Sequence, residues 1–574
     1  MKIVVTGIGI ISAIGCNKQE TLDSIQAERS GVGAMQYLQS IHTHLPVGEV
    51  KMTNEALREA LNIPSHIAVG RTTLLGLAAA REALHDAALQ DVSDMAFISG
   101  TTVGGMDTTE QHWTQWLENN ALDYVHQHEA GASTDTIASF IGDFSYKTTP
   151  STACSSALNA IMIGANLMRT GGVKKALVGG TECLSKFHLN GFNSLMILDS
   201  APCRPFDATR AGLNLGEGAS YLILENEEDA LKRGAHIYGY IAGYGNTCDA
   251  YHQTASSPDG EGAYLAMKQT LQMANIMPEQ VDYINAHGTG TPNNDLSESA
   301  AIRRLFSEKI PFVSSTKAFT GHTTSASGSI EAAICLLCMQ NNIIPANLNW
   351  SATDDTLVMP VVHNVQHDLQ CVLCNSFGFG GNDSSLVLTK TGISDLSSNL
   401  SNVAISYSPL YNGEEIDYKQ FISPIEARRM TKQLRQTLAA SLSALHDANL
   451  SPDAIICATR YGCMTNSMVF LNEMLSTNED GLKPTRFIQS THNTTAGLLA
   501  IKQQNKGYNI TYSSGNNSWN DAIFDAIMQM QLGFIQSALV VAFDEYVEDW
   551  DNILQKVGLQ SCDIAKAQLL TLQN

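Results

Sequence analysis

The sequence predicts an α/β protein whose helices cover the faces of a sheet. Short apolar runs typical of buried strands recur along residues 1–390, and alanine-rich helical runs lie between several of them. This alternation is typical of layered α/β folds. The strand-like runs are KIVVTGIGI, MAFISGT, KALVGGTE, SYLILE, VDYINAHG, FVSSTK, CVLCNSFGF and SLVLT, and two of the helical runs are GLAAAREALHDAAL and SALNAIMIGANLM.

Composition narrows the class of protein. The chain has 574 residues, 44% hydrophobic and 16% charged, which is typical of a globular protein with several cores. Its formal net charge of −22 argues against nucleic acid or an anionic membrane as a partner, because both require a basic face. No apolar run approaches the roughly 20 residues of a membrane-spanning helix.

The first strand-like run, MKIVVTGIGIISAIG, has two features that resemble motifs. Gly7, Gly9 and Gly15 interrupt it, so we interpret it as a buried strand and turn rather than a signal peptide. Gly7 and Gly9 suggest a dinucleotide fingerprint, but the third glycine is missing, so this interpretation is weak. With no export signal, the 12 cysteines are expected to be reduced thiols in a cytoplasmic protein.

Two cysteine pairs have the spacing of a zinc site. Cys335 and Cys338 lie in an apolar helical run, and Cys371 and Cys374 lie in a strand-like run whose successive side chains face opposite ways. The gap between the pairs is long for a zinc module. We therefore expect buried apolar thiols and no metal, with zinc as the weaker alternative.

The end of the chain repeats its beginning. EALHDAAL, AFISGTTVGGM and KALVGGTE recur as SALHDANL, AIICATRYGCM and SALVVAFD, each about 360 residues later. The polar segment 391–402 reads as a linker. The predicted organisation is a domain over 1–390, a second copy over 403–560 and a tail over 561–574. By the same offset, Cys154 in STACSSALNA corresponds to Asn516 in SSGNNSWNDA.

Cys154 is the first candidate catalytic residue. It is predicted to lie on a strand-to-helix turn, where the N-terminus of the following helix favours a thiolate and lowers the thiol pKa. Taken alone, the residue is equally well explained as a core thiol. His287 and His322 each follow a strand in a glycine-rich turn, and Lys317 precedes His322. A cysteine with two such histidines indicates nucleophilic catalysis with donors for developing negative charge.

These motifs identify a family. Residues 1–390 resemble a β-ketoacyl-acyl-carrier-protein synthase, a condensing enzyme of the thiolase superfamily. The resemblance rests on motifs in the family's order: TACSSA, CRPFDATRAGLNLGEGA, NAHGTGTPNND, STKAFTGH and NSFGFGGND. It implies a layered α-β-α-β-α fold of two related halves, about 1–245 and 246–390. A thiolase would need a second catalytic cysteine in the last glycine-rich turn, and NSFGFGGND has none.

The resemblance also implies roles. Cys154 accepts an acyl group from a carrier-protein thioester, and His287 and His322 assist decarboxylation of a malonyl thioester and stabilise the enolate. Lys317 orients the His322 region. The other implied roles are an oxyanion hole formed by the backbone N–H groups of Cys154 and Phe379, a gate formed by Phe379, support from Glu331, contacts from Thr289 and Thr291 to the pantetheine arm, and an acyl-pocket wall at Val103.

The chain departs from the family at three positions. RAGLNLGEGA carries Ala211 and Asn214 where the family has RDGFVLGEGA, which puts the packing of that loop in question. Val103 stands where the family often has Ile, which would deepen the acyl pocket. Ordinary core variation explains that exchange better, because such swaps cost little.

The second copy resembles the first half of a synthase without its nucleophile. It is similar to truncated ketosynthase-like domains of pigment and polyene pathways and, more loosely, to chain-length factors. We therefore expect it not to catalyse condensation, and to replace or cap the dimer contact of the family, so that the protein is either a homodimer or a single-chain equivalent.

One basic stretch, EARRMTKQLRQ, carries Arg428, Arg429, Lys432 and Arg435. It could dock an acidic carrier protein, although a solvated helix face explains it somewhat better. The expected partner is an acyl carrier protein, whose 4′-phosphopantetheine arm brings the substrate, and no other cofactor is expected. The alternative function is a non-catalytic chain-length or scaffold partner. The intact set of Cys154, His287 and His322 favours the enzyme.

Overall fold

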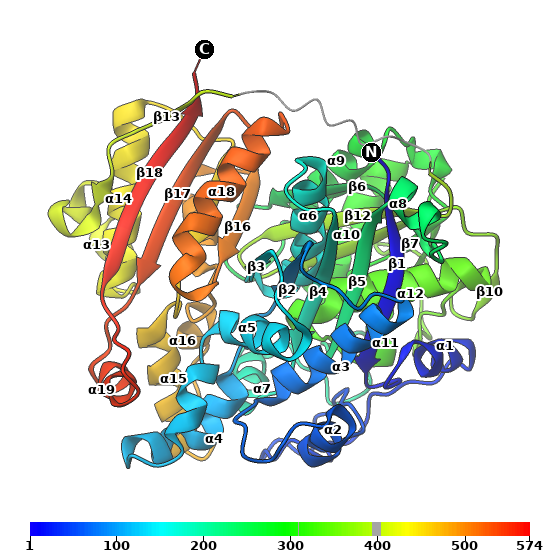
Figure 1. Cartoon of the computed structure of the whole chain (residues 1–574), viewed down its shortest axis with the longest axis horizontal. Helices are drawn as coiled ribbons and strands as arrows, with labels where there is room; N and C mark the ends of the chain where they lie inside the picture. Colours follow the sequence, from blue (N-terminus) through cyan, green and yellow to red (C-terminus); the bar gives the residue numbers. More distant parts are fainter. Residues whose placement is uncertain (308, 393–402, 574) are drawn as a thin grey trace.

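A computed structural model describes residues 1–307, 309–392 and 403–573. Within these residues, the first domain builds one ten-stranded sheet and the C-terminal copy builds a six-stranded sheet. Most of the segment 391–402, predicted as a linker, lies outside the described residues. Figure 1 shows the two sheets side by side, with the C-terminal copy in yellow to red.

The ten-stranded sheet consists of two halves of identical topology. In each half the spatial order of the five strands is third, second, fourth, fifth, first, and the fourth, fifth and first strands pair antiparallel. The halves join where β1 pairs with β6. The first half contains β1 (Ile3–Ser12), β2 (Met95–Gly100), β3 (Tyr146–Thr148), β4 (Lys175–Glu182) and β5 (Gly218–Asn226), and the second contains β6 (Gly239–Cys248), β7 (Tyr283–Asn285), β8 (Phe312–Ser314), β11 (Cys371–Gly378) and β12 (Asn382–Thr389).

The predicted boundary at residue 245 is therefore too late. Strand β6 occupies in the second half the place of β1 in the first, so the second half begins by Gly239. A further small ladder, β9 (Ile343–Ile344) with β10 (Val365–Gln366), lies outside the main sheet.

Two helices between the halves form the central layer. Both α6 (Ser156–Arg169) and α12 (Ser327–Asn341) are buried along nearly their whole length, and they pack on each other and on strands of the sheet. Helix α3 (Arg71–Asp86) covers β1 and β5, and α9 (Glu261–Ala274) covers β6 and β12. The predicted five-layer fold is confirmed. It requires central helices that are apolar on most of their surface, because both of their faces meet the core.

The other elements of the first domain are shorter or peripheral. They are α1 (Lys18–Gln26), α2 (Asn54–Leu61), α4 (Met106–Leu117), α5 (Ala130–Ile141), α7 (Lys186–Ser194), α8 (Glu227–Lys232), α10 (Pro292–Phe306) and α11 (Lys317–Thr320), with 3₁₀ turns η1 (Leu122–Gln127), η2 (Ala153–Ser155), η3 (Pro278–Gln280) and η4 (Thr324–Ala326).

The C-terminal copy repeats the topology of one half. Its strands are β13 (Ile405–Tyr407), β15 (Ala454–Ala458), β16 (Tyr508–Tyr512), β17 (Ser537–Asp544) and β18 (Ile564–Leu572), and β14 (Tyr411–Asn412) also pairs with β18. The segment 561–574, predicted as a tail, instead supplies β18, which pairs along its length with β17. That prediction was wrong because the repeat was matched only as far as the fourth strand.

Helices cover both faces of the smaller sheet. Helix α14 (Lys432–Ala448) packs on β17 and β18, and α18 (Ser518–Gln531) packs on β15 and β17. The remaining elements are α13 (Pro424–Ala427), α15 (Met464–Ser476), α16 (Pro484–Ile488), α17 (Thr494–Gln503), α19 (Glu548–Lys556), η5 (Gly413–Glu415), η6 (Tyr418–Gln420) and η7 (Gly515–Asn517). None of the described helices is long and apolar enough to span a membrane.

The two copies meet through equivalent segments in antiparallel alignment. Pro150 forms an antiparallel β-bridge with Tyr512. Tyr512 is the residue of the second copy that corresponds to Pro150, at the same offset that relates Asn516 to Cys154. On either side, Ser151 N–H donates to the Thr511 carbonyl and Ser513 N–H donates to the Thr149 carbonyl, both at 2.8 Å. The two hydrogen bonds are therefore related by exchanging the copies. Such reciprocal contacts between equivalent residues are characteristic of a twofold interface. The C-terminal copy thus occupies the position of a symmetry mate.

Candidate active site

The thiol lies on the predicted turn. Cys154 is in η2 at the start of α6, and Ala153 before it has a φ of 53°. The Ser156 hydroxyl closes the turn by donating to the Ala153 carbonyl (2.7 Å) and accepting from Thr152 N–H (2.9 Å). Cys154 is 6% exposed. The turn therefore presents a buried thiol at the N-terminal end of the central helix.

The structure brings the two predicted histidines to this thiol. His322 Nε2 lies 3.2 Å from Cys154 Sγ, and its Nδ1 lies 3.0 Å from the Ser327 hydroxyl. The rings of His287 and His322 are 5.3 Å apart, centroid to centroid, and nearly perpendicular. Residues more than 130 positions apart in the chain thus form one cluster, as the motifs predicted.

Lys317 contacts a different histidine from the one predicted. Its Nζ lies 3.3 Å from Nδ1 of His287 and 2.5 Å from a Glu331 carboxylate oxygen. A lysine ammonium has only donors, so His287 Nδ1 must accept, and the neutral ring carries its proton on Nε2. The expectation that Lys317 orients the His322 region is corrected: it sets the tautomer of His287, while Glu331 holds Lys317.

Burial decides the charge state of the thiol. It raises the pKa of Cys154 to about 12, and the opposing effects of Lys317 and of a hydrogen bond from Phe379 N–H are smaller. The prediction of a lowered thiol pKa is therefore wrong, because burial destabilises the thiolate more than the helix N-terminus stabilises it. At neutral pH Cys154 is therefore a thiol, which can act as a nucleophile only if a base accepts its proton. His322 Nε2 is the nitrogen in position to take it.

Burial also keeps both imidazoles neutral. It lowers the pKa values of His287 and His322 well below their ordinary range, and the Lys317 charge lowers both further. Burial raises the pKa of Glu331 to about 7 against the effect of Lys317. Neutral imidazoles can accept a proton from a thiol or donate a hydrogen bond to an oxyanion.

Two buried carboxylates support the site and were not predicted. Glu298 on α10 accepts the N–H groups of His287 (2.9 Å) and Gly288 (2.8 Å), and burial raises its pKa to about 6. Glu182 accepts from Val103 N–H and from Ser325, so it ties the first half to the second. A carboxylate on the apolar face of the helix after NAHGTGTP was the available signal for Glu298.

A cavity of about 310 Å³ opens above the thiol. Cys154, His287, His322, Phe379, Thr289 and Thr291 all line it. The two threonine hydroxyls lie 2.9 Å apart, and Phe379 stacks on Phe192 at 5.5 Å between ring centroids. The predicted positions for the pantetheine arm and for the gate thus share one cavity with the thiol, while their roles stay predictions.

Val103 does not line that cavity. It borders a separate space of about 30 Å³ between the copies, which Tyr461 and His492 of the C-terminal copy close from the other side. His128 and His188 also line this space, and burial lowers the pKa values of both histidines to about 3 and that of His492 to about 4. The prediction that Val103 walls the acyl pocket stays untested.

The unusual loop residue Asn214 is well packed. Its side chain accepts from Cys203 N–H (2.6 Å) and donates to the Asp199 carbonyl (3.0 Å), and its own carbonyl accepts from His322 N–H (2.7 Å). The departure from RDGFVLGEGA therefore leaves a loop that positions the histidine.

The C-terminal copy preserves the turn without the thiol. The Ser518 hydroxyl repeats both bonds of Ser156, to the Gly515 carbonyl (2.8 Å) and from Ser514 N–H (2.9 Å). Asn516 is exposed, and its Oδ1 accepts from Arg460 (3.2 Å), which pairs with Glu129. This turn therefore carries an exposed amide side chain where the first domain has the buried Cys154 thiol.

Other predicted features lie away from the thiol. Arg428, Arg429 and Lys432 are exposed at α13 and α14, Lys432 pairs with Asp563 (3.2 Å), and Arg435 lies over the Tyr418 ring. Cys335 and Cys338 lie on α12, and Cys371 and Cys374 lie on β11. Across the described residues, no group of three or more His, Cys, Asp or Glu side chains is arranged to hold a metal ion.

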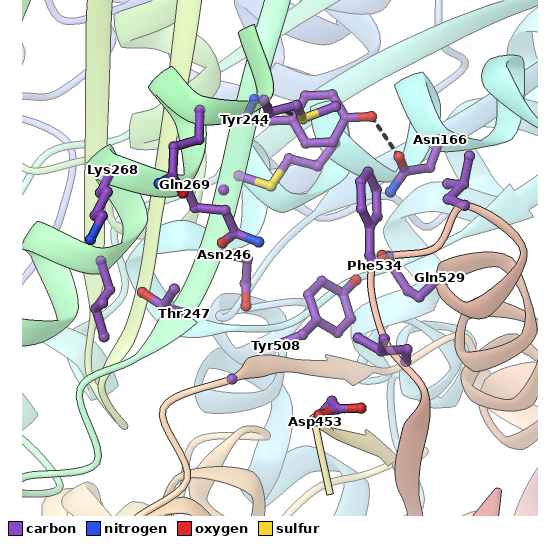
Figure 2. Close-up of a pocket in the computed structure, with 18 of the residues that line it drawn as sticks. Asn166, Tyr244, Asn246, Thr247, Lys268, Gln269, Asp453, Tyr508, Gln529 and Phe534 are labelled. Atoms are coloured by element: carbon purple, nitrogen blue, oxygen red, sulfur yellow. Dashed lines mark hydrogen bonds between the residues drawn. The ribbon is translucent and has the colours of Figure 1, made fainter. Parts of the chain in front are cut away.

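A second cavity, of about 790 Å³, lies between the copies (Figure 2). Tyr244 and Asn166 from the first domain border it and are hydrogen-bonded to each other, and Tyr508 and Phe534 border it from the C-terminal copy. None of the predicted catalytic residues lines it.

Comparisons with known proteins agree with this geometry. Family models described as "Beta-ketoacyl synthase, N-terminal domain" match residues 1–230 and, separately, 407–574, and "Beta-ketoacyl synthase, C-terminal domain" matches 238–351. The chain is 32% identical over 410 residues to 3-oxoacyl-(acyl-carrier-protein) synthase 2 of Staphylococcus aureus strain N315, covering 68% of this chain and 98% of that protein.

Two solved structures extend the comparison. "The ishigamide ketosynthase/chain length factor" superposes with a TM-score of 0.64 at 30% identity, over 68% of this chain and 99% of that one. "PfaC Keto synthase-Chain length factor" covers 100% of this chain and 78% of its own, with a TM-score of 0.81 at 17% identity, which shows a shared fold across both copies. The chain belongs to the beta-ketoacyl synthase family of condensing enzymes, and its C-terminal copy is a second domain of the same fold.

Proposed function

We propose that residues 1–390 are an active 3-oxoacyl-acyl-carrier-protein synthase and that the C-terminal copy is its non-catalytic companion. The observation that carries the proposal is the 3.2 Å contact between Cys154 Sγ and His322 Nε2, with His287 beside them, in a cavity that reaches the thiol. A scaffold has no use for this set. Acyl carrier protein is the proposed partner, because it is the substrate carrier in the name of the curated relative.

The first half-reaction transfers the acyl group. Cys154 sulfur attacks the carbonyl carbon of the acyl thioester while His322 Nε2 takes the thiol proton. The carbon–sulfur bond to the pantetheine arm then breaks, and the departing thiolate leaves with that proton. The N–H groups of Cys154 and Phe379 are the proposed donors to the oxyanion formed between these steps.

The second half-reaction makes the carbon–carbon bond. The malonyl thioester loses carbon dioxide, and the electron pair of the broken bond forms an enolate. His287, with its proton on Nε2, donates to the enolate oxygen, and His322, whose ring lies 5.3 Å from that of His287, is the second histidine to which the resemblance assigns this step. The enolate carbon attacks the acyl-Cys154 carbonyl, Cys154 leaves as a thiolate and takes a proton from solvent, and a 3-oxoacyl thioester two carbons longer departs. These steps call on no metal or nucleotide.

Intact-mass spectrometry tests both half-reactions. The protein is incubated with acyl-carrier proteins of graded chain length and then with malonyl-carrier protein. We expect an acyl adduct that is absent in Cys154→Ala, followed by its loss and the appearance of a 3-oxoacyl product. No adduct with any acyl donor, from a protein that remains folded, would overturn the proposal and favour the chain-length or scaffold role.

The companion role of the C-terminal copy rests on a different observation. Asn516 replaces the thiol at an exposed turn, and the copy occupies the position of a symmetry mate. A chain that carries its own mate needs no second copy of itself to complete this contact. We therefore propose a single-chain equivalent of a dimer.

A further inference from the structure

The loop that carries the gate residue touches the C-terminal copy directly. This loop, residues 377–381, contains Phe379, whose carbonyl oxygen accepts a hydrogen bond from Asn493 Nδ2 at 2.8 Å. On the other side of the same residue, Phe379 N–H faces the sulfur of Cys154. The backbone of Phe379 thus contacts the C-terminal copy through its carbonyl group and the thiol of Cys154 through its N–H group.

The side chain of Asn493 makes this contact and does not cap its own helix. It occupies the N-cap position of α17, where an asparagine side chain normally accepts from the backbone N–H groups of the first turn. Here it makes no such bond, and its buried Oδ1 has no hydrogen-bond partner among the described residues. Asn493 is 2% exposed, so this arrangement costs stability locally. A side chain that serves only its own helix would cap it.

The first turn of α17 also approaches the loop closely at two glycines. Gly380 has a φ of 85°, and a Cβ there would lie 2.8 Å from Asn493 Nδ2. A Cβ on Gly497 would lie 2.9 Å from Gly380 Cα. Both positions therefore exclude larger side chains, and α17 and the gate loop meet backbone to backbone.

An aromatic stack forms a second connection. The Phe379 ring stacks on Phe192 of α7, and Phe192 packs edge-on against Phe487 of α16 at 5.6 Å. A Cβ on Gly191 would lie 2.2 Å from the Phe487 ring, so the ring is seated directly against α7. Both connections to the gate come from residues 487–497 of the C-terminal copy.

We propose that Asn493 is a positioning residue for the Phe379 gate, so that the catalytically inactive copy controls access to Cys154. This proposal rests on the proposed function in one respect, because its effect on the rate of condensation can be seen only in a working synthase. The access of a reagent to Cys154 past Phe379 does not require enzymatic activity, so it can be measured separately. The two proposals can therefore fail separately.

Selective alkylation of Cys154 measures the gate without the enzymatic reaction. The full chain is treated with a small reagent, iodoacetamide, and with a bulky one, N-benzylmaleimide, and the Cys154 peptide is quantified by mass spectrometry. The ratio of the two rate constants cancels the thiolate fraction and reports steric access. Asn493→Ala removes the bond to Phe379. Asn505→Ala is the matched control, since Asn505 Nδ2 donates to the Pro452 carbonyl beyond the other end of α17.

We expect the bulky-to-small ratio to rise about three- to tenfold in Asn493→Ala, in proportion to the population shift that one lost hydrogen bond allows. It should stay at the wild-type value in Asn505→Ala. An unchanged ratio in a folded Asn493→Ala protein would overturn the proposal, as would an equal rise in both variants. Gly497→Ala provides a second variant, because its methyl group displaces Gly380 while Asn493 remains, and it should raise the ratio as well.

Steady-state kinetics then separate positioning from general destabilisation. In Asn493→Ala we expect kcat for condensation to fall about tenfold, because the Phe379 N–H donor is no longer held, while KM for malonyl-carrier protein changes less than about twofold. Asn493→Ser, which can cap α17 but is too short to reach Phe379, should behave like Asn493→Ala. Recovery of wild-type kcat in Asn493→Ser would show that the loss in Asn493→Ala comes from a weakened start of α17 and not from the lost bond to Phe379, and it would overturn the proposal. Inactivity of the wild-type chain would count against the proposed function and leave the alkylation result standing.

Discussion

Lys317 Nζ lies between His287 Nδ1, at 3.3 Å, and a Glu331 carboxylate oxygen, at 2.5 Å, and all three side chains are buried. The ion pair of Lys317 and Glu331 presents a hydrogen-bond donor to His287. A buried ion pair by itself adds little to the stability of a fold, so we interpret this donor as the role of the pair. This contact sets the tautomer of His287 and leaves its proton on Nε2.

Removing the lysine should separate its catalytic effect from its structural one. Lys317→Met leaves Glu331 buried without its cation, which costs about 3–5 kcal/mol of unfolding free energy. Burial raises the folded pKa of Glu331 to about 7 while Lys317 opposes the rise, so the wild type loses the stability from this group as pH rises to about 7 and then levels off. Without Lys317 the pKa of Glu331 rises further, and the variant goes on losing stability above pH 7. The deficit measured by urea unfolding should therefore be larger at pH 8 than at pH 6.

The double variant Lys317→Met/Glu331→Leu is the control. It removes the unpaired carboxylate and should recover most of the unfolding free energy, but condensation should remain at least about tenfold slower because His287 has lost its fixed tautomer. Full recovery of activity in the double variant would contradict the role given to Lys317.

The protonated resting state of Cys154 predicts a steep pH dependence. Because burial raises the thiol pKa to about 12, the thiolate fraction should grow about tenfold for each pH unit between pH 7 and 10. The rate of Cys154 alkylation by iodoacetamide, followed on its peptide by mass spectrometry, should rise across this range without levelling off. A plateau below pH 8 would show that the helix terminus and Lys317 outweigh burial.

Three histidines that line the small space between the copies predict acid sensitivity. Burial lowers the folded pKa values of His128, His188 and His492 to about 3, 3 and 4, below the unfolded value of about 6.5. Their stabilising contribution is present above pH 6.5 and is lost as pH falls, at about 1.4 kcal/mol per pH unit for each histidine.

Urea unfolding between pH 7 and pH 5 measures this effect. Replacing His188 with Gln should reduce the slope of unfolding free energy against pH by about one proton, whatever its effect on stability at pH 8. The same slope in wild type and variant would mean that His188 is already protonated or hydrated in the folded protein.

Restoring a thiol to the C-terminal copy should not restore chemistry. In Cys154→Ala/Asn516→Cys the new thiol lies on an exposed turn beside Arg460, which favours a reactive thiolate, but no histidine pair faces it. Iodoacetamide should modify position 516 readily, while acyl-carrier protein should leave no adduct above the Cys154→Ala background. An acyl adduct at position 516 would show that the second copy retains a substrate site.

The sequence alone predicted the parts that depend on local pattern. The motifs TACSSA and NAHGTGTP place Cys154 and His287 at turns between a strand and a helix, because glycines and small residues mark such turns. The prediction that His322 directly follows a strand was wrong, because the short helix α11 lies between β8 and His322. The repeat showed that Asn516 corresponds to Cys154, and the structure confirms that Ser518 closes its turn with the same hydrogen bond that Ser156 makes in the first domain. The layered fold follows from the same patterns.

Long-range distances and burial lie outside any such pattern. Whether Lys317 meets His287 or His322 depends on where α11 lies against β7, and the pKa of Cys154 depends on how much water the surrounding layers exclude. The strand β18 escaped the sequence comparison because its pairing with β17 defines it better than its composition does. The hydrogen bond between Asn493 and Phe379 is one of several between the two copies, and no local pattern specifies it.

The sequence by itself thus determined which residues are candidates for the chemistry and which copy lacks the thiol, because those depend on residue type and local turns. Only the tertiary structure decided which nitrogen of His287 faces Lys317, that burial raises the pKa of the Cys154 thiol, and that the C-terminal copy contacts Phe379, because each depends on atoms that packing brings together from distant parts of the chain.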